Sequence, residues 1–192
     1  MEAPIYLFTG PEFGKRNDAV DSVKKALVKK VGEIDEHLFY LCETPFSQVM
    51  TILQSGTLFS NGVFVVCKNA ELLKKKDELQ MISDWLETAD GSAVLVLVSD
   101  EISVDSKLEK IVPDTKQNRQ KFWEMFENEK LPWVINYFSK NGYLITKDAA
   151  QLVLDLVENN TEALKRECSR FFVCFEKSHE ITEDDVDSIL TH

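Results

Sequence analysis

Residues 93–98 form an unbroken run of apolar side chains that does not alternate with polar residues. A strand with one face in water alternates between the two kinds, so this run is typical of a strand that is covered on both faces. Shorter runs of the same kind occur at 5–9, 38–42 and 63–67, and segments with helical periodicity separate them. This alternation predicts a parallel sheet with helices on both of its faces.

The helices of this part of the chain are expected at about 15–31, 46–55, 70–88 and 106–112, where apolar residues recur with the helical period. Residues 121–126 are expected to form a fifth strand, although polar residues interrupt the apolar ones. Residues 1–130 are therefore predicted to form an α/β domain with five parallel strands.

From Leu131 onward the pattern changes, because strand-like runs no longer occur and the periodicity becomes helical throughout. One helix is expected at 133–140. Three more are expected after Thr146, Asn160 and Thr182, which are residue types that cap helix N-termini. Residues 131–192 are predicted to form a small all-helical domain.

The composition excludes several classes of protein. The net charge is −11, with 22 Lys and Arg against 33 Asp and Glu, which argues against a surface that binds nucleic acid as a whole. A long apolar run and an export signal are both missing from the sequence, so a cytoplasmic chain without a membrane segment is expected. The four cysteines form no CxxC and the three histidines lie far apart, so we expect no metal site. The chain also lacks a local signature of nucleophilic catalysis, and no catalytic residue is assigned.

A glycine-containing loop follows the first expected strand, in the place of a phosphate-binding loop. A working loop needs GxxxxGK followed by Ser or Thr, because amides and the lysine hold the phosphates and the hydroxyl holds magnesium. Here three residues separate Gly10 from Gly14, and Lys15 is followed by Arg16 where the hydroxyl should be. Glu12 also places a negative charge in the loop. We interpret it as a degenerate phosphate loop that binds no nucleotide, so no cofactor is expected.

Two charged segments each allow two interpretations. Asp100 follows the strand at 93–98 and could hold Mg²⁺, but an Asp at a strand end more often caps the next turn. Lys74, Lys75 and Lys76, together with Lys68, are the most basic run of the chain. A solvated helix face is the default for such a run, and a patch that faces DNA is the alternative.

Thr57, Leu58 and Phe59 lie on a short connection between an expected helix and the strand at 63–67. The simplest interpretation is that Leu58 and Phe59 pack under the edge of the sheet. The functional interpretation is an exposed apolar plug for a pocket in a partner, since such anchors dominate the energy of interfaces.

The order and spacing of several segments resemble the delta subunit of the bacterial DNA polymerase III clamp loader, and the resemblance extends over the whole chain. It rests on Tyr6-Leu7-Phe8-Thr9-Gly10, the helix–Thr57-Leu58-Phe59–strand unit, the run at 93–98, Trp133 with Gly142 nine residues later, and Asn160-Thr161-Glu162-Ala163-Leu164-Lys165-Arg166-Glu167.

The resemblance implies an AAA+-like α/β domain at 1–130 and a helical lid at 131–192. A third helical collar domain, through which the family assembles with the other loader subunits, would lie beyond His192 and is expected to be absent from this chain. The family's delta subunits bind no ATP and have no catalytic activity of their own. They act as parts of the polymerase holoenzyme.

The resemblance also implies a partner, the ring-shaped sliding clamp (the beta subunit). In the family a Leu-Phe pair enters the clamp's hydrophobic pocket and helps to open one clamp interface, which corresponds to Leu58 and Phe59 here. Family members often carry a further apolar anchor two positions before the Leu, where this chain has Gly56. Contact with DNA is expected to be weak, or to occur only within the complex.

The sequence therefore predicts a non-catalytic clamp-loader subunit that binds the sliding clamp. Two alternatives remain open at this point. One is an active P-loop ATPase or nucleotide kinase, and the other is a DNA-binding module that uses Lys68 and Lys74–Lys76.

Overall fold

The computed structural model describes residues 3–55, 60–158 and 160–191. Contacts divide the chain into two compact units. The first comprises Met1–Pro11 and Arg16–Trp123, and the second comprises Glu12–Lys15 and Glu124–His192.

The first unit is built on a five-stranded sheet in the order β2-β3-β4-β1-β5, and every neighbouring pair is parallel. The central strand β4 buries six of its seven residues, as the unbroken apolar run predicts. This confirms the expected α/β fold with five parallel strands. The strands are β1 (Ile5–Thr9), β2 (Ile34–Tyr40), β3 (Gly62–Lys68), β4 (Ala93–Ser99) and β5 (Arg119–Lys121).

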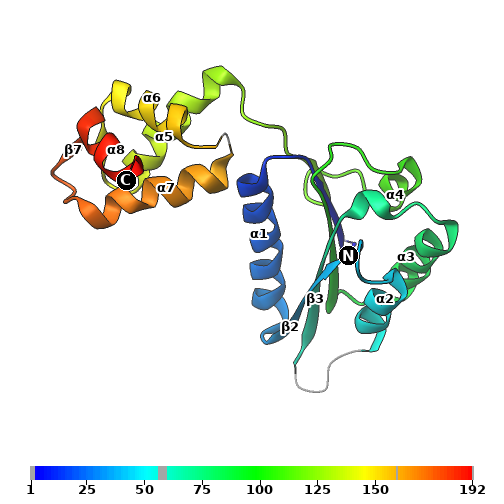
Figure 1. The fold of residues 1–192 in the computed structure, drawn as a ribbon. Coiled ribbons are helices and arrows are strands. Elements are labelled where there is room, and N and C mark those ends of the chain that lie inside the picture. Colours follow the sequence, from blue (N-terminus) through cyan, green and yellow to red (C-terminus); the bar gives the residue numbers. More distant parts are fainter. Residues whose placement is uncertain (1–2, 56–59, 159, 192) are drawn as a thin grey trace. The chain divides into compact units, whose positions relative to one another are not determined.

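Helices cover the two faces of this sheet unequally (Figure 1). On one face, α1 (Phe13–Val31) packs through Leu27 against a cluster that includes Phe8, Phe64 and Val96. The other face carries a larger core, in which buried side chains of the sheet meet those of three helices. These helices are α2 (Phe46–Ser55), α3 (Lys76–Thr88) and α4 (Ser106–Ile111), and a 3₁₀ turn, η1 (Ala70–Leu72), precedes α3.

The fifth strand lies earlier than the sequence pattern predicts. The prediction of a strand at 121–126 is wrong, because β5 pairs with β1 only from Arg119 to Lys121, opposite Leu7 to Thr9. β1 ends at Thr9, so the chain beyond Lys121 has no strand beside it to extend the ladder. Trp123 and Phe126 are accordingly 60% and 70% exposed.

The second unit is helical apart from a two-residue parallel pairing that the pattern did not predict. Thr146 and Asn160 cap their helices as expected, because their side-chain oxygens accept hydrogen bonds from the amides of Ala149 and Ala163. The elements are α5 (Glu127–Lys140), β6 (Leu144–Ile145), α6 (Lys147–Leu156), α7 (Thr161–Cys174), β7 (Glu180–Ile181) and α8 (Glu183–Leu190). α5 begins six residues before the expected helix at 133 and contains Pro132, and it therefore spans residue 131, the expected domain boundary.

None of the helices described is long and apolar enough to cross a membrane. Within the described residues, no group of three or more His, Cys, Asp or Glu side chains could hold a metal ion.

Candidate functional site

The residues predicted to form the apolar plug, Thr57, Leu58 and Phe59, lie outside the described residues, as does Gly56. Their neighbours on both sides are well anchored. α2 buries Val49 and Leu53 before it ends at Ser55, and β3 begins at Gly62 with Val63 buried behind it. The segment therefore connects two elements of the core, and its own contacts remain a prediction.

The degenerate loop begins at the carboxyl end of β1. Gly10 has a φ of 114°, and its amide donates a hydrogen bond to the Ser99 carbonyl oxygen (3.0 Å). A Cβ atom at this position would lie 2.2 Å from the carbonyl oxygen of Phe122. Gly10 is thus required both by its backbone conformation and by the close approach of the segment that follows β5.

Arg16 is the best-defined polar side chain of this loop and is only 2% exposed. Its Nη1 donates to the carbonyl oxygens of Gly10 (2.5 Å) and Ser99 (2.8 Å), and its Nη2 contacts Asp100 Oδ1 at 2.6 Å. The guanidinium joins the loop after β1 to the end of β4, and it occupies the sequence position where a phosphate loop carries its magnesium-binding hydroxyl. The guanidinium keeps its positive charge and lies beside Asp100, the acidic residue that would bind the metal ion in a nucleotide site.

The ion pair between Arg16 and Asp100 is a contact that the sequence analysis did not predict. Arg16 was noted only as a departure from the phosphate-loop pattern, and Asp100 was interpreted as a turn cap. The contact could have been predicted by considering Arg16 and Asp100 together. β1 and β4 are neighbours in the sheet, so their carboxyl ends bring the two residues side by side.

Glu12 and Gly14 have contacts within the second unit. Glu12 is fully buried, and its Oε1 accepts hydrogen bonds from the Gly14 amide (3.2 Å), the Thr161 amide (3.0 Å) and the Thr161 hydroxyl (2.5 Å). A Cβ atom on Gly14 would lie 2.0 Å from Thr161 Oγ1. The Glu12 carboxylate therefore accepts the hydrogen bond of the Gly14 amide, which is the kind of donor that holds a phosphate in a phosphate-binding loop.

The predicted lysines do not converge with this loop. Lys15 is exposed, and so are Lys74, Lys75 and Lys76, which precede and open α3. Lys75 is 3.5 Å from Glu78 Oε1, and the ammonium of Lys68 lies 5.6 Å from the centre of the Tyr40 ring. The lysine run follows η1 as a solvated segment, and its possible contact with DNA stays a prediction.

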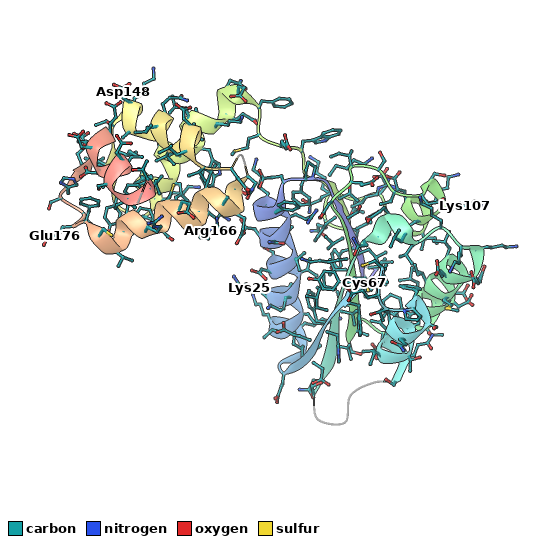
Figure 2. The ribbon with its side chains drawn as sticks, viewed as in Figure 1. Lys25, Cys67, Lys107, Asp148, Arg166 and Glu176 are labelled. Carbon is teal, nitrogen blue, oxygen red and sulfur yellow. The ribbon has the colours of Figure 1, made fainter. Side chains whose placement is uncertain are left out.

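The cysteines divide into two pairs by burial. Cys67 and Cys168 are buried, and burial raises the pKa of each thiol to about 12, with the charge of Glu167 adding to the effect at Cys168. Figure 2 places Cys67 among the side chains of the sheet interior. Cys42 and Cys174 are exposed, and Cys42 lies in the turn that follows β2.

No protein-family model and no curated protein matches the chain. Its fold is nevertheless shared with solved structures. The Bacillus subtilis DNA clamp loader delta protein (YqeN) has a TM-score of 0.61 and 18% identity, over 98% of this chain and 58% of that one. The Thermotoga maritima RuvB Holliday junction branch migration motor has a TM-score of 0.59 and 16% identity, over 98% and 61%.

A third similar structure is domain III of the Thermotoga maritima replication initiation protein DnaA. It has a TM-score of 0.53 and 12% identity, over 99% of this chain and 84% of that one. The chain thus has the AAA+-like fold expected from its sequence, and it spans about three fifths of the length of the clamp loader delta protein and of RuvB.

Proposed function

We propose that this chain is a clamp-loader module of the delta type, which binds a sliding clamp and neither binds nor hydrolyses ATP. The observation that carries the proposal is the similarity of nearly the whole chain to a clamp loader delta protein, which agrees with the resemblance found in its sequence. In this proposal the α/β part, predicted as residues 1–130, binds the clamp, and residues 131–192 act as a lid. The module would work with other loader subunits in the bacterial cytoplasm.

The clamp contact is assigned to Leu58 and Phe59, with Thr57 beside them. Burying each apolar side chain in a pocket of the clamp is worth about 1.5–3 kcal/mol. If the pocket accepts the pair better when one clamp interface is open, the same contacts favour the open ring, because a ligand shifts an equilibrium by its difference in affinity for the two states.

Clamp binding is tested by calorimetric titration of the purified sliding clamp from the same organism. The wild type should bind, and Leu58→Ala/Phe59→Ala should weaken the complex by about 2–4 kcal/mol, roughly 30- to 1000-fold in Kd. Leu156→Ala/Val173→Ala is the matched control, because it removes two exposed apolar side chains elsewhere and should bind as the wild type does. Equal binding by both double variants, or none by the folded wild type, would reject the assignment.

The absence of nucleotide binding is assigned to Arg16 and Glu12. The Arg16 guanidinium is held by two carbonyls and Asp100, and Glu12 accepts the Gly14 amide, so the positions that would bind magnesium and phosphate have partners from the chain itself. Equilibrium dialysis with Mg²⁺ and radiolabelled ATP should give no binding at millimolar nucleotide. Saturable binding would support the alternative of an active ATPase.

A further inference from the structure

The two edges of the sheet differ in how they are protected. β5 has only three residues, and two of them carry positive charges that are paired, Arg119 with Asp114 (2.5 Å) and Lys121 with Glu109 (3.3 Å). Short strands and basic side chains are the usual means by which proteins prevent another strand from adding to an edge. The β5 edge is therefore protected.

β2, at the opposite edge, is longer than β5 and carries acidic side chains in place of basic ones. It is seven residues long and pairs with β3 in unbroken register from Ile34 to Tyr40, with no bulge. It contains no Lys, Arg or Pro. By the same criteria it is an open edge.

The backbone parity of β2 identifies the residues that point outward. The Leu41 amide donates to the Lys68 carbonyl oxygen, so the odd-numbered residues of the strand turn their backbone groups toward β3. Glu36 and Leu38 consequently turn their N–H and C=O groups away from the sheet. β2 has a neighbouring strand on its β3 side alone, and no turn or loop among the described residues bonds to these four groups.

The side chains of β2 differ between the two halves of the open edge. Its first half is acidic, with Glu33 just before the strand and Asp35 and Glu36 within it, and its second half exposes Leu38 (53%) and Tyr40 (41%). Two basic residues lie beside it: Lys24 of α1 is 3.2 Å from Glu36, and the ammonium of Lys68 of β3 lies 5.6 Å from the centre of the Tyr40 ring.

Beside the exposed residues lies a groove of about 290 Å³ between α1 and the sheet. Its apolar lining comes from Val20 of α1 and from Leu38, Phe64, Val66 and Val98 of three strands. Of the helices described, α1 alone packs on this face of the sheet, which is why the groove is open (Figure 1).

We propose that the β2 edge is a second protein-binding surface, which takes an extended segment of a partner protein as an added antiparallel strand. The partner segment carries an apolar residue opposite Leu38 and basic residues opposite Glu36 and Asp35. Its backbone bonds to the free groups of Glu36 and Leu38, and its apolar side chain extends the wall of the groove. β2 shares no residue with the 57–59 segment, so this surface is independent of the proposed clamp contact.

The test uses a synthetic peptide, VTITKKT-amide, whose N-terminal amine carries a fluorophore. In antiparallel register its Ile lies opposite Leu38 and its first Lys opposite Glu36. Fluorescence anisotropy with the full chain should show saturable binding. NMR hydrogen exchange should slow about tenfold or more at the amides of Glu36 and Leu38 on saturation, while those of Asp35 and His37, already bonded to β3, change little.

Methylated peptides separate strand addition from attraction between side chains. N-methylation at the Ile and the first Lys removes the N–H groups of the peptide that face β2, and it should weaken binding about tenfold or more. N-methylation at the two inner Thr residues alters the edge of the peptide that faces away from β2, and it should change binding little. Equal loss from both peptides, or no binding of the parent peptide, would overturn the proposal.

The corresponding test in the protein introduces positive charge at the β2 edge. Leu38→Lys/Glu36→Lys should abolish binding with circular dichroism unchanged, and Leu72→Lys/Glu87→Lys, with the same charge change at exposed sites outside β2, should retain it. Sedimentation of the chain alone provides the remaining check. A dimer whose formation protects the Glu36 and Leu38 amides would show that the edge takes a second copy, and would overturn the partner strand.

Discussion

At the scale of single residues, Arg16 is a buried cation that joins the loop after β1 to the end of β4. A guanidinium cannot lose its proton inside a protein, so its burial requires acceptors on all sides. Gly10 and Ser99 supply carbonyl oxygens, and Asp100 supplies a carboxylate that remains 67% exposed at its own side chain. The arginine thus links the ends of β1 and β4.

We therefore expect Arg16→Ala to destabilise the protein by about 2–4 kcal/mol, because two buried carbonyls each lose one donor and a charge pair is broken. Arg16→Lys should cost less, since an ammonium supplies the charge without the planar fork. Urea unfolding followed by circular dichroism measures both. Lys25→Ala, at an exposed position of the same helix (Figure 2), is the control and should change little. A loss below about 0.5 kcal/mol for Arg16→Ala would show that the link contributes nothing.

The thiols provide a second prediction at this scale. The buried thiols of Cys67 and Cys168, with pKa values of about 12, are almost entirely protonated at neutral pH, and the thiolate is the reactive form. Ellman's reagent at pH 8 should therefore react quickly with Cys42 and Cys174 only, and with the other two after unfolding in guanidinium. Rapid reaction of a third thiol in the native protein would contradict the burial of Cys67 or of Cys168.

At the scale of elements, the sequence pattern predicts the strands that lie inside the sheet better than those at its edges. β4 is predicted from composition alone because both of its faces are covered. β5 ends where its partner strand β1 ends. That point depends on another segment, so the sequence of β5 does not indicate it. The 3₁₀ turn before α3 was likewise missed, because Asn69 adopts a left-handed backbone conformation (φ 63°) that separates η1 from β3.

Helix α8 gives a prediction for pH dependence. Burial alone would raise the pKa of Asp185, but hydrogen bonds from the Thr182 amide, the His179 ring and the Thr182 hydroxyl outweigh it and lower the pKa below 3.8. A lowered folded-state pKa stabilises the protein in full above 3.8, and this contribution is lost as the pH falls further.

The stability difference between wild type and Asp185→Ala should accordingly be largest near pH 6, about 1 kcal/mol for a helix cap, and should shrink below pH 3.8. Urea unfolding at pH 6 and pH 3, monitored by circular dichroism, measures the difference at both values. A difference that grows in acid would contradict the lowered pKa. Asp187→Ala, on the same helix, serves as a control for the loss of an acidic side chain.

At the scale of the whole molecule, the fold was predictable from the sequence, but the candidate site was predictable only in part. Gly10, Gly14 and Lys15 were interpreted as a degenerate loop from the glycine spacing together with Arg16 and Glu12, and this interpretation remains a prediction. The contact of Arg16 with Asp100 required the strand order, because the two residues are far apart in sequence and meet only when β1 and β4 are neighbours. Leu58 and Phe59 remain a prediction that follows from the family resemblance and from their place between α2 and β3.

The central claim is that this chain binds a sliding clamp without using a nucleotide. The most direct measurement is the Kd for the sliding clamp determined with and without Mg²⁺ and ATP in the same calorimetric series. The account predicts saturable binding whose Kd is the same in both conditions. Binding that requires ATP, or a folded chain that does not bind the clamp in either condition, would contradict it.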